Sequence, residues 1–201
     1  WPLSDMLRCA VSSVDRKPVK GGSIGISGHL GRVAAFAGPA STRYTDESWG
    51  VAADWNLPFS DIFAVTGEAF IGQGLGGFQA GVFQGVNTDF AHIQGNAATA
   101  DGIRAISTRG GWMQLAVTPR TKGNKLAFYG TVGLDDPDDA DLTSVASRDW
   151  RMRNLAFAGE VIYKFSPQFQ MGVEVRRFDT RYRLSRRRTA EHINLAFAYS
   201  F

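Results

Sequence analysis

Large apolar residues occupy every second position through most of the chain, and this period of two constrains the fold more than any other feature. At the C-terminus, Ile193, Leu195, Phe197, Tyr199 and Phe201 alternate with small or polar residues. Successive side chains of a β-strand point to opposite faces, so the pattern predicts a strand with one apolar and one polar face. The pattern recurs at 24–30, 49–57, 63–71, 103–118, 126–134, 155–165 and 169–175, and more weakly at 3–13. The sequence therefore predicts an all-β fold with eight or nine strands.

Strands of this kind build either a soluble barrel with an apolar core or a transmembrane barrel with an apolar outer face. The expected strands have about 10–14 residues, closer to the roughly 9–11 of tilted membrane strands than to the average of about 5–6 in soluble proteins. Aromatic residues that suit the membrane interface gather at strand ends: Trp55, Tyr163, Phe165, Phe169, Tyr199 and Phe201. The predicted fold class is a transmembrane antiparallel up-and-down β-barrel.

The connections between the expected strands alternate in length. Short turns are expected at 58–61, 119–124 and 166–168, and longer connections at 35–47, 72–102 and 136–149. Outer-membrane barrels have short periplasmic turns, longer external loops and an even number of strands. Either 3–13 is not a strand and eight strands form a complete barrel, or further strands precede it. Because the chain begins without Met or a signal segment, we expect 1–201 to be one barrel domain, the C-terminal portion of a longer barrel.

The polar face of the expected strands carries charged residues that suit a water-filled lumen. The candidate pore-lining residues are Asp54, Glu68, Arg104, Glu160, Lys164, Glu174 and Arg176. Carboxylates in a lumen repel anions and concentrate cations, and the basic residues oppose this effect. We therefore expect mild selectivity or, as an equal alternative, a structural network of ion pairs within the lumen.

The connection 72–102 is long and unusual in composition. Its 31 residues include eight Gly, neither Lys nor Arg, and the aromatic residues Phe78, Phe83 and Phe90. Loops of this length are usually functional or disordered. The candidate role is a constriction folded into the lumen, and the alternatives are an external cap, an oligomer contact or disorder.

Five aspartates crowd one expected external connection: Asp135, Asp136, Asp138, Asp139 and Asp141. Carboxylates at this density can chelate a hard cation such as Ca²⁺, although the spacing lacks the Gly and the terminal Glu of an EF-hand. The alternative is a solvated acidic turn.

Arginines gather around the last expected external hairpin: Arg181, Arg183, Arg186, Arg187 and Arg188. A guanidinium group binds phosphate in a bidentate manner, so these residues are candidates for contact with the phosphates of lipopolysaccharide. The alternative is a generic basic rim.

Several motifs resemble the C-terminal part of porin-like outer-membrane proteins of Gram-negative bacteria. They are Gly110–Leu115, Gly133–Pro137, Gly172–Val175 and the terminal Phe201. The resemblance implies a place in the outer membrane, contact with its lipid, and passive diffusion of ions or small hydrophilic solutes. It also implies that the barrel-assembly machinery recognises Phe201. It supplies no catalytic residue.

Other function classes receive little support. The single Cys9 excludes an intrachain disulfide and a Cys-based zinc site, and a net charge of +3 does not indicate nucleic-acid binding. A barrel hydrolase would need one of three histidines beside a serine, and no nucleophile motif flanks a candidate serine. We expect a porin without a cofactor rather than an enzyme. The alternative is a structural or anchoring barrel with a plugged lumen, and either form could be a homo-oligomer or a partner in an envelope complex.

Overall fold

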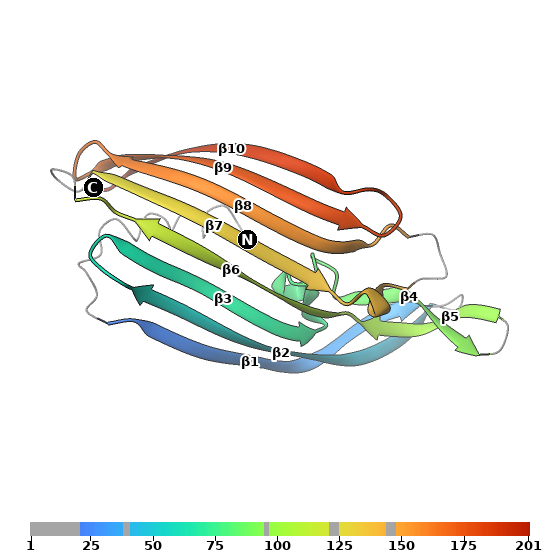
Figure 1. Cartoon of the computed structure of the whole chain (residues 1–201). Helices are drawn as coiled ribbons and strands as arrows, with labels where there is room; N and C mark the ends of the chain where they lie inside the picture. The colour runs from blue at the N-terminus through green and yellow to red at the C-terminus, as the bar shows by residue number, and fades with distance from the viewer. Residues whose placement is uncertain (1–20, 38–40, 95–96, 121–124, 144–147) are drawn as a thin grey trace.

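A computed structural model describes residues 21–37, 41–94, 97–120, 125–143 and 148–201, except for the side chains of 91–101. Eight strands form one antiparallel sheet in the order β1-β2-β3-β6-β7-β8-β9-β10 (Figure 1). They are β1 (Ser23–Ala37), β2 (Thr42–Pro58), β3 (Phe63–Gln73), β6 (Ser107–Val117), β7 (Leu126–Pro137), β8 (Arg151–Lys164), β9 (Phe169–Tyr182) and β10 (Arg188–Tyr199). All eight clearly predicted strands are present, and the weak candidate at 3–13 lies outside the described residues.

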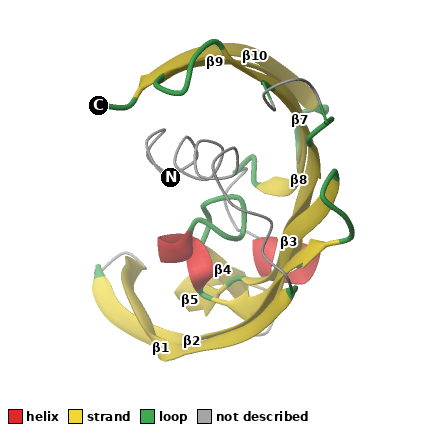
Figure 2. Cartoon of the chain, turned by 90° about the vertical axis from the view of Figure 1, so that its left-hand side faces the viewer, coloured by secondary structure: helices red, strands yellow, loops and turns green. Residues whose placement is uncertain are grey.

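The sheet curves into an open arc with β1 and β10 at its two edges (Figure 2). Within the described residues, β1 pairs with β2 only and β10 pairs with β9 only. The predicted antiparallel up-and-down architecture is confirmed, and these strands do not close a barrel.

The large apolar side chains of the sheet are exposed on its outer, convex face. The exposed fraction is 81% for Ile26, 60% for Leu195 and 48% for Met113. A water-soluble sheet packs its apolar face against a core. An outer face this apolar and this exposed is suited to lipid.

The apolar band ends at a row of charged residues near one end of the sheet. On β1 and β2 the band ends at the directly opposite residues Arg32 and Glu47. On β9 and β10 it ends at the opposite residues Arg177 and Glu191. A charge on the lipid face costs much less near the interface than at the bilayer midplane. We call this row the outer rim; the strands continue beyond it, outside the membrane-spanning segments.

The predicted long connection 35–47 is wrong, because β1 and β2 remain paired as far as Ala37 and Thr42. Only 38–41 connect the two strands. Beyond the outer rim neither face of a strand has to be apolar. The period of two therefore fades from the sequence although the backbone pairing continues.

The predicted loop 72–102 is also wrong in detail, since most of it is regular structure. It contains the 3-10 helix η1 (Leu75–Phe78) and an antiparallel hairpin of β4 (Val86–Gln94) and β5 (Ala97–Ala105). The predicted strand 103–118 is divided, because its first residues belong to β5 and β6 begins at Ser107. The hairpin forms a separate sheet with no part in the apolar band, so its sequence lacks a clean alternation.

A second 3-10 helix, η2 (Asp139–Leu142), lies between β7 and β8. In the part of the chain that the structure describes, no helix has the length and apolar character needed to span a membrane.

Charge on the outer face should destabilise the fold more than charge at a neighbouring inner position. Val132 points outward from β7, and the adjacent Thr131 points inward, where its hydroxyl accepts a hydrogen bond from Gln114 at 3.1 Å. We expect Val132→Arg to lower the free energy of unfolding in lipid vesicles by about 2–4 kcal/mol. Thr131→Arg, the matched control, should cost only about 1 kcal/mol, the loss of one hydrogen bond. Urea titration measures both, and equal losses would contradict the assignment of the two faces.

Candidate functional site

Six of the seven predicted pore-lining residues lie on the inner face of the eight-stranded sheet: Asp54, Glu68, Glu160, Lys164, Glu174 and Arg176. Asp54 on β2 is directly opposite Glu68 on β3, and Glu160 on β8 is directly opposite Glu174 on β9. The sequence could not show these pairs, because they depend on the register between strands. They concentrate negative charge at two places on the inner wall.

The charge at Glu174 is largely compensated by its neighbours. Its carboxylate accepts hydrogen bonds from Arg176 and from the Asn194 side chain, each at 2.8 Å. Both members of the ion pair are four-fifths buried. This part of the inner wall is a structural network of the kind expected as the alternative to selectivity.

Asp54 and Glu68 differ from Glu174, because no ion pair links either of them to a cation among the described residues. The Asp54 carboxylate lies over Gly25 of β1, where a Cβ atom would come within 2.6 Å of Oδ1. Like charges directly opposite each other on neighbouring strands destabilise a sheet. The inner face therefore retains an uncompensated negative region on β2 and β3.

Arg104 is not on the wall, which corrects its assignment as a residue of the strand 103–118. It lies on β5, and its Nε donates to Asp141 Oδ1 at 2.8 Å. Its guanidinium also lies 5.4 Å from the centroid of the Phe90 ring. The role of Arg104 is thus to connect the β4–β5 hairpin to η2.

Residues 74–106, here called the inward segment, leave the wall after β3 and return to it at β6. The part with η1 lies on the concave side of the sheet (Figure 2), and the β4–β5 hairpin extends beyond one end of the sheet (Figure 1). The segment leaves and rejoins the wall at one place, because the Gly74 N–H donates to the Ile106 carbonyl at 3.0 Å. The Ile106 N–H in turn donates to the Gly85 carbonyl at 3.0 Å. The segment is therefore an insertion between the paired strands β3 and β6, with its two ends close together.

Two wall glycines allow the inward segment to lie directly on the sheet. A Cβ atom at Gly50 would be 3.1 Å from the Leu75 side chain, and one at Gly72 would be 2.8 Å from it. Leu75 is 6% exposed. A larger residue at Gly50 would occupy the space that Leu75 fills, and one at Gly72 would first meet the Trp49 carbonyl oxygen at 2.2 Å.

The three phenylalanines singled out in the sequence have different environments. The Phe78 ring contacts the ring of His29 on β1, with the centroids 4.8 Å apart. Phe78 and Phe83 are each 62% exposed, whereas Phe90 is half-buried beside Arg104. Phe78 and Phe83 are therefore the aromatic side chains that the inward segment exposes.

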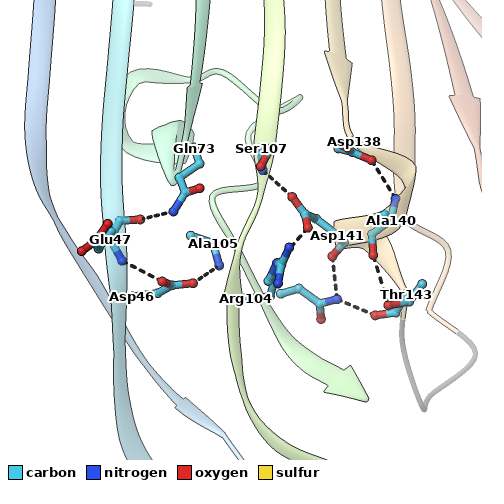
Figure 3. A network of polar contacts seen from close by, with 11 residues as sticks. Asp46, Glu47, Gln73, Arg104, Ala105, Ser107, Asp138, Ala140, Asp141 and Thr143 are labelled. Carbon is cyan, nitrogen blue, oxygen red and sulfur yellow. Dashed lines mark hydrogen bonds and ion pairs between the residues drawn. The ribbon is translucent and has the colours of Figure 1, made fainter. Parts of the chain in front are cut away.

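Carboxylates of the wall and of η2 hold the second half of the inward segment (Figure 3). Asp141, which is 3% exposed, accepts from the Ser107 N–H at 2.9 Å as well as from Arg104. Asp46 on β2 accepts from the Ala105 N–H at 2.7 Å. The side-chain amide of Asn87 donates to the Asp141 carbonyl at 2.9 Å. These contacts satisfy polar groups that burial would otherwise leave unpaired.

Asp135 holds the first half of the segment at a strained turn. Gly81, Val82 and Phe83 have φ angles of 67°, 50° and 63°. Left-handed backbone costs of the order of 1–3 kcal/mol for a residue other than glycine, and a β-branched residue such as Val82 is a clear outlier there. Asp135 accepts from the N–H groups of Gly81 at 3.1 Å and Val82 at 2.6 Å. It also accepts from the Thr108 hydroxyl at 2.8 Å.

The five aspartates proposed as a calcium site have different partners. Asp135 and Asp141 hold the inward segment, Asp138 accepts from the Ala140 N–H, and the other two form exposed ion pairs. No group of three or more acidic, His or Cys side chains among the described residues is arranged to hold a metal ion. Two members of the cluster are thus structural clamps.

An apolar cluster and a glutamine fix the inward segment to β8. Ile106 packs with Leu142, Trp150 and Met152, all at most 8% exposed. The side chain of Gln84 donates to the Arg151 carbonyl at 2.8 Å and accepts from the Arg151 N–H at 3.0 Å. The amide group of Gln84 therefore pairs with the backbone as a neighbouring strand would.

Four of the five arginines proposed to contact lipopolysaccharide make contacts within the chain. Arg181 pairs with Asp139 at 3.4 Å, Arg183 donates to the Leu142 carbonyl, Arg187 pairs with Asp179, and Arg188 lies 5.2 Å from the Tyr182 ring centroid. The fifth, Arg186, is exposed.

Asp179 lies beyond the outer rim on the outward face of β9, with its side chain 4% exposed. Its carboxylate accepts from the Thr189 hydroxyl at 2.7 Å and from the guanidinium groups of Arg187 and Arg177. The Thr189 hydrogen bond first, and then that of Arg187, lower the pKa of Asp179 to about 2. Hydrogen bonds to the charged form of a carboxyl favour that form.

The histidines considered for a hydrolase lie at opposite edges of the sheet. His29 on β1 contacts Phe78, and His192 on β10 contacts Phe178 with ring centroids 5.8 Å apart. The side chain of His92 lies outside the described residues. The structure does not bring His29 and His192 together.

Sequence reasoning did not identify Asp46, Gln84 or Asn87, although each holds the inward segment. Their partners are mostly backbone groups far away in the chain, and such contacts leave no local pattern. Gly50 and Gly72, by contrast, leave a local pattern in the sequence. Small residues at polar-face positions of a strand indicate that another segment approaches closely.

No protein-family model matches the chain, and no curated protein matches it. A crystal structure of the outer membrane channel DcaP of Acinetobacter baumannii has a similar fold, with a TM-score of 0.56 and 15% sequence identity. The match covers 92% of this chain and 55% of that channel, so the chain spans about half of the channel's length. With the exposed outer face, this likeness confirms the predicted fold class, a transmembrane antiparallel β-barrel.

Substitution of Gly50 should release the inward segment without disturbing the wall. In Gly50→Val the new side chain competes with Leu75, so we expect faster amide hydrogen exchange in 74–85 and unchanged exchange in β2 and β3. Gly28→Val is the matched control, since a Cβ atom there would meet only the Gly50 carbonyl oxygen at 3.6 Å. Unchanged exchange in 74–85 would show that Leu75 does not anchor the segment.

Stability should depend on Asp179 in acid. Because its folded-state pKa of about 2 is below the usual value of about 3.9, its stabilisation is present above about pH 4 and is lost as the pH falls towards 2. We expect Asp179→Asn to lower the urea midpoint at pH 6 and to have little effect at pH 2. Asp139→Asn, which removes an exposed ion pair, should have little effect at either pH.

Proposed function

We propose that this chain forms part of the wall of an outer-membrane diffusion channel for ions or small hydrophilic solutes, narrowed by the inward segment. The observation that carries the proposal is the attachment of the first half of the inward segment, 74–85, to the concave side of a lipid-facing sheet. A segment that only capped the barrel externally would not need Leu75 in contact with inner-face glycines. The likeness to an outer membrane channel agrees with this function.

Further strands would complete the barrel in this proposal. β1 and β10 present unpaired backbone edges within the described residues, and unpaired backbone groups in lipid are very unfavourable. The apolar side chains at these edges are the most exposed of the band, with Ile26 at 81% and Ile193 at 77%. Additional strands on both edges would satisfy the backbone and give a bore wide enough to contain the inward segment.

The proposal includes a mild preference for cations, which is based on Asp54 and Glu68. No ion pair links either of them to a cation among the described residues, whereas Glu174 is paired with Arg176. Carboxylates in a pore concentrate cations. In this proposal the short turns between strands face the periplasm. The opposite end of the barrel is then external, and exposed basic residues there, such as Arg186, contact lipopolysaccharide.

Replacement of the inward segment by a short turn tests the constriction. Gln73 and Ser107 are the last paired residues of β3 and β6, so an Asn-Gly turn in place of 74–106 would connect them as a two-residue hairpin. We expect single-channel conductance in planar bilayers with KCl to rise by at least about two-fold, because the bore widens. Retained heat-modifiability on gels controls for an intact barrel.

An unchanged conductance in the replacement variant would contradict a constriction at this place. The absence of channels from both proteins, with heat-modifiability intact, would favour a structural or anchoring barrel with a closed lumen. A reversal potential in a KCl gradient tests the selectivity. Asp54→Asn with Glu68→Gln should lower the preference for K⁺ over Cl⁻, while Glu174→Gln should change it less.

A further inference from the structure

The turn 81–83 stores strain at the place where the inward segment meets the wall. Three consecutive residues have left-handed backbone, and two of them, Val82 and Phe83, are not glycine. The turn is closed by a hydrogen bond from the Gln84 N–H to the Gly81 carbonyl at 2.9 Å. Residues in such a conformation persist only where their surroundings fix them, and they are frequent in segments that switch.

A single carboxylate of the wall fixes this turn. Asp135 accepts two N–H groups of the turn, from Gly81 and Val82, and its third donor is Thr108 on the neighbouring strand β6. Charge-assisted hydrogen bonds of this kind are about twice as strong as neutral ones. Because the carboxylate bridges strands β6 and β7 to the turn, it couples the backbone of the turn to the barrel wall.

The conformation of the turn determines how an exposed aromatic side chain is presented. Phe83 is the last left-handed residue and is 62% exposed, whereas its neighbour Val82 is 5% exposed. If the turn relaxed to right-handed backbone, these two side chains would have to change direction. The other attachments, at Gln84, Asp46 and Asp141, would still hold the rest of the segment.

We propose that Asp135 is a positioning residue that sets the width of the channel by holding the turn 81–83 in its left-handed conformation. Without the carboxylate, the turn exchanges between the constricting conformation and a relaxed one in which the first half of the segment moves away from its present place. The inference rests on the proposed function, since it concerns the regulation of the same constriction.

Asp135→Asn tests the proposal, because the amide has the shape of the carboxylate but lacks the charge. We expect single-channel records to show a second, larger conductance level, no higher than that of the variant in which Asn-Gly replaces 74–106. Amide exchange at Gly81 and Val82 should become faster. Thr108→Val removes one donor to the carboxylate and should have the same effects to a smaller extent.

Asp136→Asn is the matched control. Asp136 is the next residue in β7, points outward and forms a 3.4 Å ion pair with Arg109. We expect it to leave the conductance and the exchange at Gly81 unchanged. The same response from Asp136→Asn and Asp135→Asn would overturn the proposal, because a general change of charge would then explain both.

A glycine at position 82 tests the role of strain. Glycine adopts left-handed backbone without a steric penalty, so in the Val82→Gly protein the turn should persist without the carboxylate. The effect of Asp135→Asn on conductance should therefore be smaller in the Val82→Gly background than in the natural chain. An equal effect in both backgrounds would contradict control by strain.

The two proposals can fail separately. If the replacement of 74–106 widens the channel and Asp135→Asn has no effect, the constriction exists but Asp135 does not position it. If the replacement itself has no effect, the proposed constriction fails, and the inference about Asp135 fails with it.

Discussion

Backbone hydrogen bonding between long antiparallel strands is the constraint on which the rest of this structure depends. In lipid no water can satisfy an unpaired N–H or C=O group, so each strand needs a neighbour along its membrane-spanning length. Continuous pairing then fixes the two faces, because successive side chains alternate. The apolar face must be directed to the lipid and the polar face to the interior. Adjacent residues of one strand, such as Val132 and Thr131, therefore have different environments, because they lie on opposite sides of the sheet.

Backbone polar groups inside the arc also need hydrogen-bond partners, and side chains provide them there. The inward segment carries backbone groups away from the strand ladder, and carboxylates satisfy several of them. Asp46 accepts the Ala105 N–H near its end, and Asp135 accepts two N–H groups at its turn. A buried carboxylate is costly unless it is hydrogen-bonded. The clamps and the segment therefore depend on each other, and removal of either would leave the other unsatisfied.

Glu174 and the pair Asp54 and Glu68 on the inner wall have different surroundings. Glu174 is neutralised by Arg176 and oriented by Asn194, so it contributes mainly to the packing of β9 and β10. Asp54 and Glu68 lie opposite each other without a described cation partner, and this arrangement opposes folding. The proposed selectivity is therefore attributed to Asp54 and Glu68. The distinction between the two depends on neighbours across strands and not on the residue type.

The prediction of the fold from the sequence succeeded where one environment acts on a whole strand. Lipid along one face of β10 requires Ile193, Leu195 and Phe197 at alternate positions, so the strand is visible in the sequence. The same reasoning failed for the end of β1, and for β4 and β5, because those segments pair without a lipid-facing side. The position of Arg104 was wrong for this reason.

The sequence by itself determined the fold class, the eight strands of the wall and the face of each, since these follow from the contact of each residue with lipid or with the interior. Only the tertiary structure decided which charges meet and what the aspartates do. Asp135 and Gly81 are 54 residues apart in the chain, and their contact depends on the register of β6 and β7 and on the path of the inward segment. A local pattern cannot encode such a contact, because each partner alone is compatible with a solvated loop.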